Sequence, residues 1–333
     1  MGIEMTLQLR RREFMLALAG VAAWPRAARA QQSAMPVIGF LAGPSAAVSK
    51  APLAGFRQGL RQTGYVEGQN CHIAFRWAEG RYDRFPELAS ELAGLPVAVI
   101  AAFSPAAALA AIAATKTVPI VFITSDDPVK LRLVASLNRP GGNATGVAFL
   151  STELVGKQFE LLRELLPGSA VVGLLVNPAS PSAATHMRDI PAATQALGLQ
   201  IVVQNASSER DLETAFAALV QQKAAGLVIP SDPFFFGQRE QLAMLAARNA
   251  LPAIYPDREY VADGGLMSYG ASVAEAYRQA GVFTGRILKG DKPADLPVQQ
   301  AVKVELLVNL TTAKALGLEM PLSMLMRITE TIE

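Results

Sequence analysis

Four positions in the chain place a hydroxyl or carboxyl side chain directly before a proline, at the end of an apolar run. These pairs are Ser104-Pro105, Asp127-Pro128, Ser180-Pro181 and Asp232-Pro233. Serine and aspartate accept hydrogen bonds from the first free N–H groups of a helix, and proline suits the first helical position. Each pair therefore predicts a rigid turn from a strand into a helix, with free N–H groups beyond the carboxyl end of the strand. Such helix starts attract carboxylates and other anions.

Each pair also has a purely structural interpretation, because Ser-Pro and Asp-Pro are ordinary helix starts. A single pair would favour capping over contact with a ligand. Four pairs in equivalent positions make a shared ligand-facing edge an equal alternative. The sequence does not say which of the caps would touch a ligand.

Other residues near these turns have two interpretations each. Asp126 is not needed for capping if Asp127 fills that role, so it is a candidate partner for an ammonium group. Asn177 can donate and accept hydrogen bonds, but Asn-Pro is also a common turn. Tyr255 ends an apolar run, where it could contact a ligand or lie in the core. In Phe234–Phe236, core packing explains two of the rings, and the third is a candidate apolar wall.

The sequence lacks the common catalytic and metal-binding patterns. It has no phosphate-binding loop, no dinucleotide-binding glycine motif after the first strand and no nucleophile elbow. His72 and His186 have no metal-binding partner at ligand spacing. Cys71, the single cysteine, lies in an alternating stretch that predicts a buried, unreactive side chain without a disulfide. Paired carboxylates could perform acid–base chemistry, but the whole pattern favours binding over turnover, with no cofactor and no metal ion.

Short runs rich in β-branched residues alternate with stretches of helical periodicity after residue 35. The predicted strands are Val37–Leu41, His72–Trp77, Val97–Ala101, Ile120–Ile123, Thr145–Phe149, Val171–Val176, Gln200–Val203, Gly226–Ile229, Ala253–Tyr255, Gly265–Ser268 and Lys303–Val308. The predicted helices are Leu53–Thr63, Pro86–Leu95, Pro105–Ala114, Leu154–Leu165, Ala183–Leu197, Glu209–Gln222, Gly237–Asn249 and Val273–Leu288. Continuously apolar strands between helices predict parallel sheets that are covered on both faces.

Three loop-like segments interrupt this alternation, and there are too many strands for one open sheet. The segments are "NRPGGNATGV" at 138–147, "VADGGLMSYGAS" at 261–272 and "KGDKPADLPVQQ" at 289–300. We therefore predict an α/β fold with two Rossmann-like doubly wound lobes joined by a three-segment hinge. The predicted boundaries place residues 35–148 and 270–297 in the first lobe, and residues 149–269 and 298–333 in the second.

Residues 1–30 are predicted to be an export signal of the twin-arginine type. Arg11-Arg12 precedes Phe14-Met15 and a short apolar stretch, and the small residues Ala28 and Ala30 suit a signal-peptidase pocket. The alternative is an amphipathic N-terminal helix that the mature protein retains.

The rest of the chain is almost neutral. Residues 1–30 hold five of the 30 basic residues but only two of the 28 acidic residues. This balance gives no reason to expect binding to nucleic acid or to an anionic membrane. No other segment is long and apolar enough to span a bilayer, so we expect a soluble, exported protein without stable membrane insertion.

Many blocks of the chain, in order, resemble a family of exported ABC-transporter substrate-binding proteins. They include "MPVIGFL", "AFRQGLRQTGYVEGQN", "RWAEGRYDRFPELA", "VPIVF", "DPVKLRLVASLNRPGGNATGV", "LLVNP", "SERDLETAF", "YRQAGVFTGRILKGDKPADLPVQQ" and "LVNLTTAKALGL". The resemblance covers residues 35–333. It implies the type I periplasmic-binding fold, a ligand between the two lobes, a periplasmic location, and partnership with the permease and ATPase subunits of an importer.

The resemblance also implies a set of ligand-binding positions at strand ends. They are Ser45, Ser104, Pro105, Ala106, Ser125, Asp126, Asn177, Ser180, Asp232 and Tyr255. Amino acids are the solutes most often suggested for the family. An amino-acid ligand would place its carboxylate at Ser104 or Ser180 and its ammonium group on Asp126 or Asp232. Phe103 stands where many relatives have a small residue, which predicts a narrower or more apolar pocket on that side.

We therefore expect a periplasmic solute-binding protein that closes on an amino acid or a related carboxylate. Two alternatives are a sensory module that reports the same ligand to a membrane receptor and an exported α/β enzyme. A cytosolic repressor is disfavoured, because an export signal stands where a DNA-binding domain would be.

Overall fold

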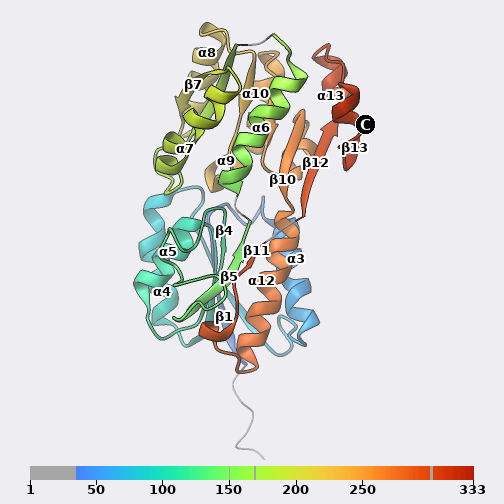
Figure 1. Cartoon of the computed structure of the whole chain (residues 1–333). Coiled ribbons are helices and arrows are strands. Elements are labelled where there is room, and N and C mark those ends of the chain that lie inside the picture. The colour runs from blue at the N-terminus through green and yellow to red at the C-terminus, as the bar shows by residue number, and fades with distance from the viewer. Residues whose placement is uncertain (1–34, 150, 169, 301–302) are drawn as a thin grey trace, which may run out of the picture. The chain divides into compact units, whose positions relative to one another are not determined.

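The computed structural model describes residues 35–149, 151–168, 170–300 and 303–333 (Figure 1). The predicted export signal lies outside these residues. Residues 36–333 form one compact unit. In the described part of the chain, every helix is too short or too polar to cross a bilayer.

The first sheet has six parallel strands in the order β11-β5-β4-β3-β1-β2. Its strands are β1 (Val37–Ala42), β2 (His72–Trp77), β3 (Val97–Phe103), β4 (Ile120–Thr124), β5 (Ala144–Ala148) and β11 (Gln299–Gln300). Its helices are α3 (Lys50–Gln62), α4 (Phe85–Gly94), α5 (Pro105–Ala114) and α12 (Val273–Leu288), with the short η1 (Tyr82–Arg84) and η2 (Pro293–Asp295). One hydrophobic core joins α4 and α5 to the sheet, and another joins α3 and α12 to its other face (Figure 1).

The second sheet has seven strands in the order β13-β12-β10-β9-β8-β6-β7. They are β6 (Val171–Val176), β7 (Gln200–Asn205), β8 (Gly226–Val228), β9 (Ala253–Tyr255), β10 (Met267–Ala271), β12 (Val304–Asn309) and β13 (Glu330–Ile332). All neighbours are parallel except β10 and β12, which are antiparallel. The helices are α6 (Ser151–Leu165), α7 (Ala183–Ala196), α8 (Glu209–Gln221), α9 (Pro233–Gly237), α10 (Arg239–Arg248), α11 (Arg258–Ala262), α13 (Leu310–Ala315) and α14 (Leu322–Leu325).

Helices cover the second sheet on both faces as well. The side chains of α8, α9 and α10 pack on one face, and those of α6, α7 and α13 pack on the other. The predicted architecture of two doubly wound α/β lobes is therefore confirmed.

The chain passes between the two sheets three times: after β5, between β10 and α12, and between β11 and β12. Helix α12 packs against α3 and therefore belongs to the first lobe. Strand β11 pairs with β5, so Gln299–Gln300 is part of the first sheet, although the boundary predicted from sequence places it in the second lobe.

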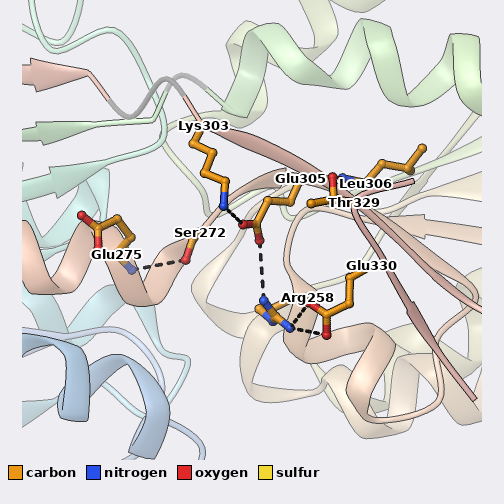
Figure 2. A network of polar contacts seen from close by, with 8 residues as sticks. All are labelled: Arg258, Ser272, Glu275, Lys303, Glu305, Leu306, Thr329 and Glu330. Atoms are coloured by element: carbon orange, nitrogen blue, oxygen red, sulfur yellow. Dashed lines mark hydrogen bonds and ion pairs between the residues drawn. The ribbon is translucent and has the colours of Figure 1, made fainter. Parts of the chain in front are cut away.

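Ion pairs join three elements beside the second of these crossings (Figure 2). The Arg258 guanidinium lies 2.8 Å from a carboxylate oxygen of Glu330 and 3.6 Å from one of Glu305, which also accepts from Lys303 at 2.9 Å. At the crossing itself, the hydroxyl of Ser272 accepts from the backbone N–H of Glu275 and caps α12. Arg258 thus holds α11 against the two strands β12 and β13 at this end of the sheet.

Two of the four predicted helix starts are observed, at Ser104 and Asp232. Asp127 accepts from the N–H of Val129 at 2.8 Å but caps only a turn, and Arg132 then adopts a left-handed conformation (φ 58°), which a helix does not continue through. Pro181 also lies in a turn, and α7 begins two residues later with Ser182 as its N-cap. The predicted helix Gly237–Asn249 is found as α10, which begins two residues later, and the short helix α9 precedes it.

Glycines bring α3 and α12 into close backbone contact. On each helix two of them are spaced by four residues, Gly55 and Gly59 on α3 and Gly281 and Gly285 on α12. A Cβ atom at Gly59 would lie 1.9 Å from the carbonyl oxygen of Arg278, and one at Gly281 would lie 2.2 Å from that of Phe56. No side chain larger than hydrogen fits at these positions unless the helices separate.

We expect Gly59→Ala to destabilise the protein by about 1–3 kcal/mol, because the added methyl group overpacks a backbone contact. Chemical denaturation measures this change. Gly94→Ala is the matched control, since no atom lies within 4 Å of its new Cβ. Equal stability of the two variants would show that the helices accommodate the methyl group without cost.

Candidate functional site

A cavity of about 80 Å³, partly open to solvent, lies where the strand ends of both sheets meet. Described residues that line it are Pro44, Ser49, Pro52, Tyr82, Phe103, Ser104, Pro105, Ile123, Ser125, Phe149, Ser180, Ser182, Ser231, Asp232, Pro233, Phe236, Asp257, Val273 and Tyr277. Most of them lie within about six residues of the carboxyl end of a strand, which is where doubly wound folds bind ligands.

One side of the cavity is aromatic. The rings of Phe103 and Tyr277 stack with their centroids 4.3 Å apart and an interplanar angle of 9°. Phe103 also contacts the buried rings of Phe40 and Phe56, so it is held in place from behind. Phe236 lines the cavity from the other lobe. These rings form an apolar wall suited to a flat or aliphatic ligand group.

Ser104 and Pro105 bring the start of α5 to the cavity. The Ser104 hydroxyl accepts from the N–H of Ala107 at 3.1 Å and so caps the helix. Its backbone has φ 156° and ψ 163°, a region that residues other than glycine rarely adopt. The positive end of α5 therefore lies beside the cavity, where it favours a carboxylate.

Asp232 is a helix cap whose oxygens are both engaged. One oxygen accepts from the N–H groups of Phe234 and Phe235 at 2.8 and 3.1 Å, and from the Asn177 amide at 3.3 Å. The other accepts from the Tyr82 hydroxyl at 2.6 Å, which joins the two lobes. Burial raises the pKa of Asp232, although the hydrogen bonds from Tyr82, Phe235 and Asn177 act in the opposite direction.

Asp126 makes a second hydrogen bond between the lobes. One of its carboxylate oxygens accepts from the hydroxyl of Ser182 at 2.5 Å and from that of Ser125 at 3.4 Å. Asp126 is buried and outside the cavity lining, whereas Ser125 and Ser182 line it.

Tyr82 interacts with both of these carboxyl groups, since it donates to Asp232 and the charge of Asp126 also acts on its hydroxyl. Burial raises the pKa of its hydroxyl well above the usual range, and the negative charge of Asp232 adds to this effect. Tyr82 is therefore a neutral donor at physiological pH.

The remaining predicted residues lie around the cavity at different distances from its surface. Asn177 is buried behind Asp232, and its carbonyl oxygen accepts from the N–H of Ala179 at 3.0 Å. Ser45 lines a separate groove, and Ala106 lies on α5 outside the cavity lining. Tyr255 is fully buried and stacks on Tyr260 at 4.8 Å, while its hydroxyl finds no hydrogen-bond partner among the described residues.

The structure adds six polar residues to those predicted, namely Ser49, Tyr82, Ser182, Ser231, Asp257 and Tyr277. Two carry a local signal: Ser182 follows Ser180 by two residues, and Asp257 follows the end of β9 as Asp232 follows β8. Tyr82 follows β2 at a greater distance. Tyr277 reaches the cavity from α12, which returns from the far end of the chain and gives no such signal.

The ionisable side chains of the cavity wall are acidic rather than basic. The described lining contains the carboxyl groups of Asp232 and Asp257 but no lysine, arginine or histidine. Burial raises the pKa of Asp257 well above its usual range, and the nearby charge of Glu259 raises it further. Within the described ranges, no three acidic, histidine or cysteine side chains gather closely enough to hold a metal ion.

Residues 35–332 match the sequence model of a family described as ABC transporter substrate binding protein. A tyrosine-binding protein from Clostridioides difficile (strain R20291) is 28% identical over 266 residues, which are 80% of this chain and 76% of that protein.

Solved structures have the same fold. The crystal structure of a conserved domain protein from Vibrio cholerae O1 biovar El Tor has a TM-score of 0.83 and 28% identity, covering 90% of this chain and 100% of that one. A domain from Streptococcus pneumoniae in complex with L-Trp has a TM-score of 0.79 and 24% identity, covering 89% and 100%. The fold is that of the type I periplasmic binding proteins, as predicted.

We expect Asp232→Ala to lower the free energy of unfolding by about 2 kcal/mol or more, because it removes a helix cap and leaves buried donors unpaired. Urea denaturation at neutral pH measures the loss. Ser208→Ala removes an exposed cap, that of α8, and should cost only about 0.5–1 kcal/mol. If both variants lose the same amount, the buried hydrogen bonds of Asp232 contribute nothing beyond capping.

Proposed function

The chain belongs to the family of ABC transporter substrate binding proteins, and we propose that it is the periplasmic component of an importer that closes on an amino acid. The observation that carries this proposal is the division of the cavity wall into three chemically different parts. The start of α5 favours an anion, the carboxyl side favours a cation, and the rings of Phe103 and Tyr277 favour an apolar group.

An amino acid with an apolar or aromatic side chain combines these three features in one small molecule. Its carboxylate would lie at Ser104 beside the positive end of α5, and its side chain would lie along the aromatic wall. The relative from Clostridioides difficile is described as a tyrosine-binding protein, which supports this class of ligand.

Hydrogen bonds between the lobes support closure around the ligand. Tyr82 donates to Asp232, and Ser182 donates to Asp126, each from one lobe to the other. A ligand that enters the cavity adds contacts to both lobes and so favours the closed arrangement. Permease and ATPase subunits on other chains would then receive the closed protein at the membrane, after export by the twin-arginine-type signal.

We expect L-tyrosine, L-tryptophan or L-phenylalanine to raise the melting temperature in a thermal-shift screen, while hexoses and dicarboxylic acids leave it unchanged. A ligand at 100 times its dissociation constant adds about 2.7 kcal/mol to the free energy of unfolding. Phe103→Ala should weaken binding of these amino acids, because it removes part of the aromatic wall. A screen in which only sugars stabilise the protein would contradict the proposed function.

A further inference from the structure

Asp257 stands out among the carboxyl groups of the cavity. It follows β9 as the N-cap residue of α11, it lines the cavity, and only 5% of its surface is exposed. Its carboxylate makes no capping hydrogen bond with α11, and no other hydrogen bond is found for it within the described part of the chain. A buried carboxylate without a hydrogen-bond partner lowers the stability of the fold. Its presence at the cavity therefore indicates that a ligand group is its partner.

The other two carboxylates near the cavity already have partners. Asp232 accepts four hydrogen bonds, two of them from backbone N–H groups, and Asp126 accepts from Ser182 and Ser125. A cation would have to displace these bonds to reach either residue. Asp257 has no such bond to lose.

The two arginines whose charges act on Glu259 of α11, Arg258 and Arg239, form ion pairs with other carboxylates. Figure 2 shows Arg258, the residue after Asp257, between Glu305 and Glu330, with which it forms ion pairs. The Arg239 guanidinium pairs with Asp263 at 2.5 Å. These arginines are therefore held by carboxylates other than that of Asp257.

The titratable groups that interact electrostatically with Asp257 are all acidic. They are Glu259 and Tyr260 on α11 and Tyr277 on α12. Among the described residues, no basic group offsets the charge that Asp257 carries when ionised, and a cation in the cavity would do so.

We propose that Asp257 binds the ammonium group of the amino-acid ligand and that Asp126 and Asp232 do not. This assignment rests on the proposed function and goes further by naming the residue that selects for an amine. It places the ammonium group on the second lobe and the carboxylate at α5 of the first lobe, so that the two charged groups of the ligand join the lobes. A carboxylic acid without the amine would engage the first lobe alone.

Binding of matched ligands to Asp257→Asn and to the wild type tests the assignment by calorimetry. The probes are L-tyrosine, its deaminated analogue 3-(4-hydroxyphenyl)propionate, and tyramine, which lacks the carboxylate. We expect Asp257→Asn to weaken L-tyrosine and tyramine binding by about 30-fold or more, since it leaves a buried charge unpaired. The same substitution should leave binding of the deaminated acid unchanged or improve it.

Glu259→Gln is the matched control, because this neighbouring carboxyl group lies on the same helix but outside the cavity lining. It should retain L-tyrosine affinity within a few-fold. Equal L-tyrosine affinity of Asp257→Asn and wild type overturns the assignment. If no amino acid binds the wild type, the proposed function fails. In that case, tyramine binding that depends on Asp257 still supports the cation site, and binding of anionic or neutral ligands alone overturns it.

The ligand-free protein offers an independent test through pH. The pKa of Asp257 is raised in the folded protein, so the unfolded chain loses its proton first as pH rises. Folding stability contributed by this group therefore falls from about pH 4 upward through the raised pKa. Asp257→Asn should be more stable than wild type at pH 7.5, and the difference should shrink at pH 4.5. A variant less stable than wild type at pH 7.5 would show that Asp257 has a structural partner and would overturn the assignment.

Discussion

Parallel strands in a doubly wound sheet leave only one edge where side chains can meet a ligand, and the site of this protein depends on that constraint. The strands themselves are buried on both faces by helices, so their own side chains are used for packing. Polar groups therefore gather mainly in the turns after the carboxyl ends, with Tyr277 added from α12. Two sheets that direct these ends toward one cavity bring together residues as distant as Tyr82 and Asp232, which are 150 positions apart.

The sequence was sufficient for the architecture and for part of the site. Strand and helix periodicity predicted two α/β lobes, and local capping chemistry located Ser104 and Asp232 at helix starts. Capping chemistry failed at Asp127 and Ser180, because a cap residue does not determine whether the residues after it continue as a helix. Tyr277 could not be predicted, since its place in the cavity depends on the packing of α12 against α3 and on the stack with Phe103.

Carboxyl groups in similar sequence contexts have different environments in the fold. Asp232 and Asp257 both follow a short strand of the second sheet and both precede a short helix. Asp232 caps its helix and binds a tyrosine of the other lobe, whereas Asp257 does neither. Local sequence therefore predicts that an aspartate follows the strand. Whether its carboxylate is already hydrogen-bonded depends on the tertiary structure. The protein retains a destabilising group at Asp257, and this is a common cost of a binding site.

The glycine contact between α3 and α12 has a mechanical consequence. Helix α12 begins at the crossing beside Ser272, and close backbone packing fixes it to α3 along its length. Sliding of α12 relative to α3 would separate the glycines from the opposing carbonyl groups. Helix α12 therefore moves with the first lobe as part of one rigid body. At this crossing, any rotation of the lobes must then occur in the few peptide units between β10 and α12. Tyr277 lies one turn into α12. It would therefore stay beside Phe103 throughout the rotation, and the aromatic surface of the cavity would be the same in the open and the closed states.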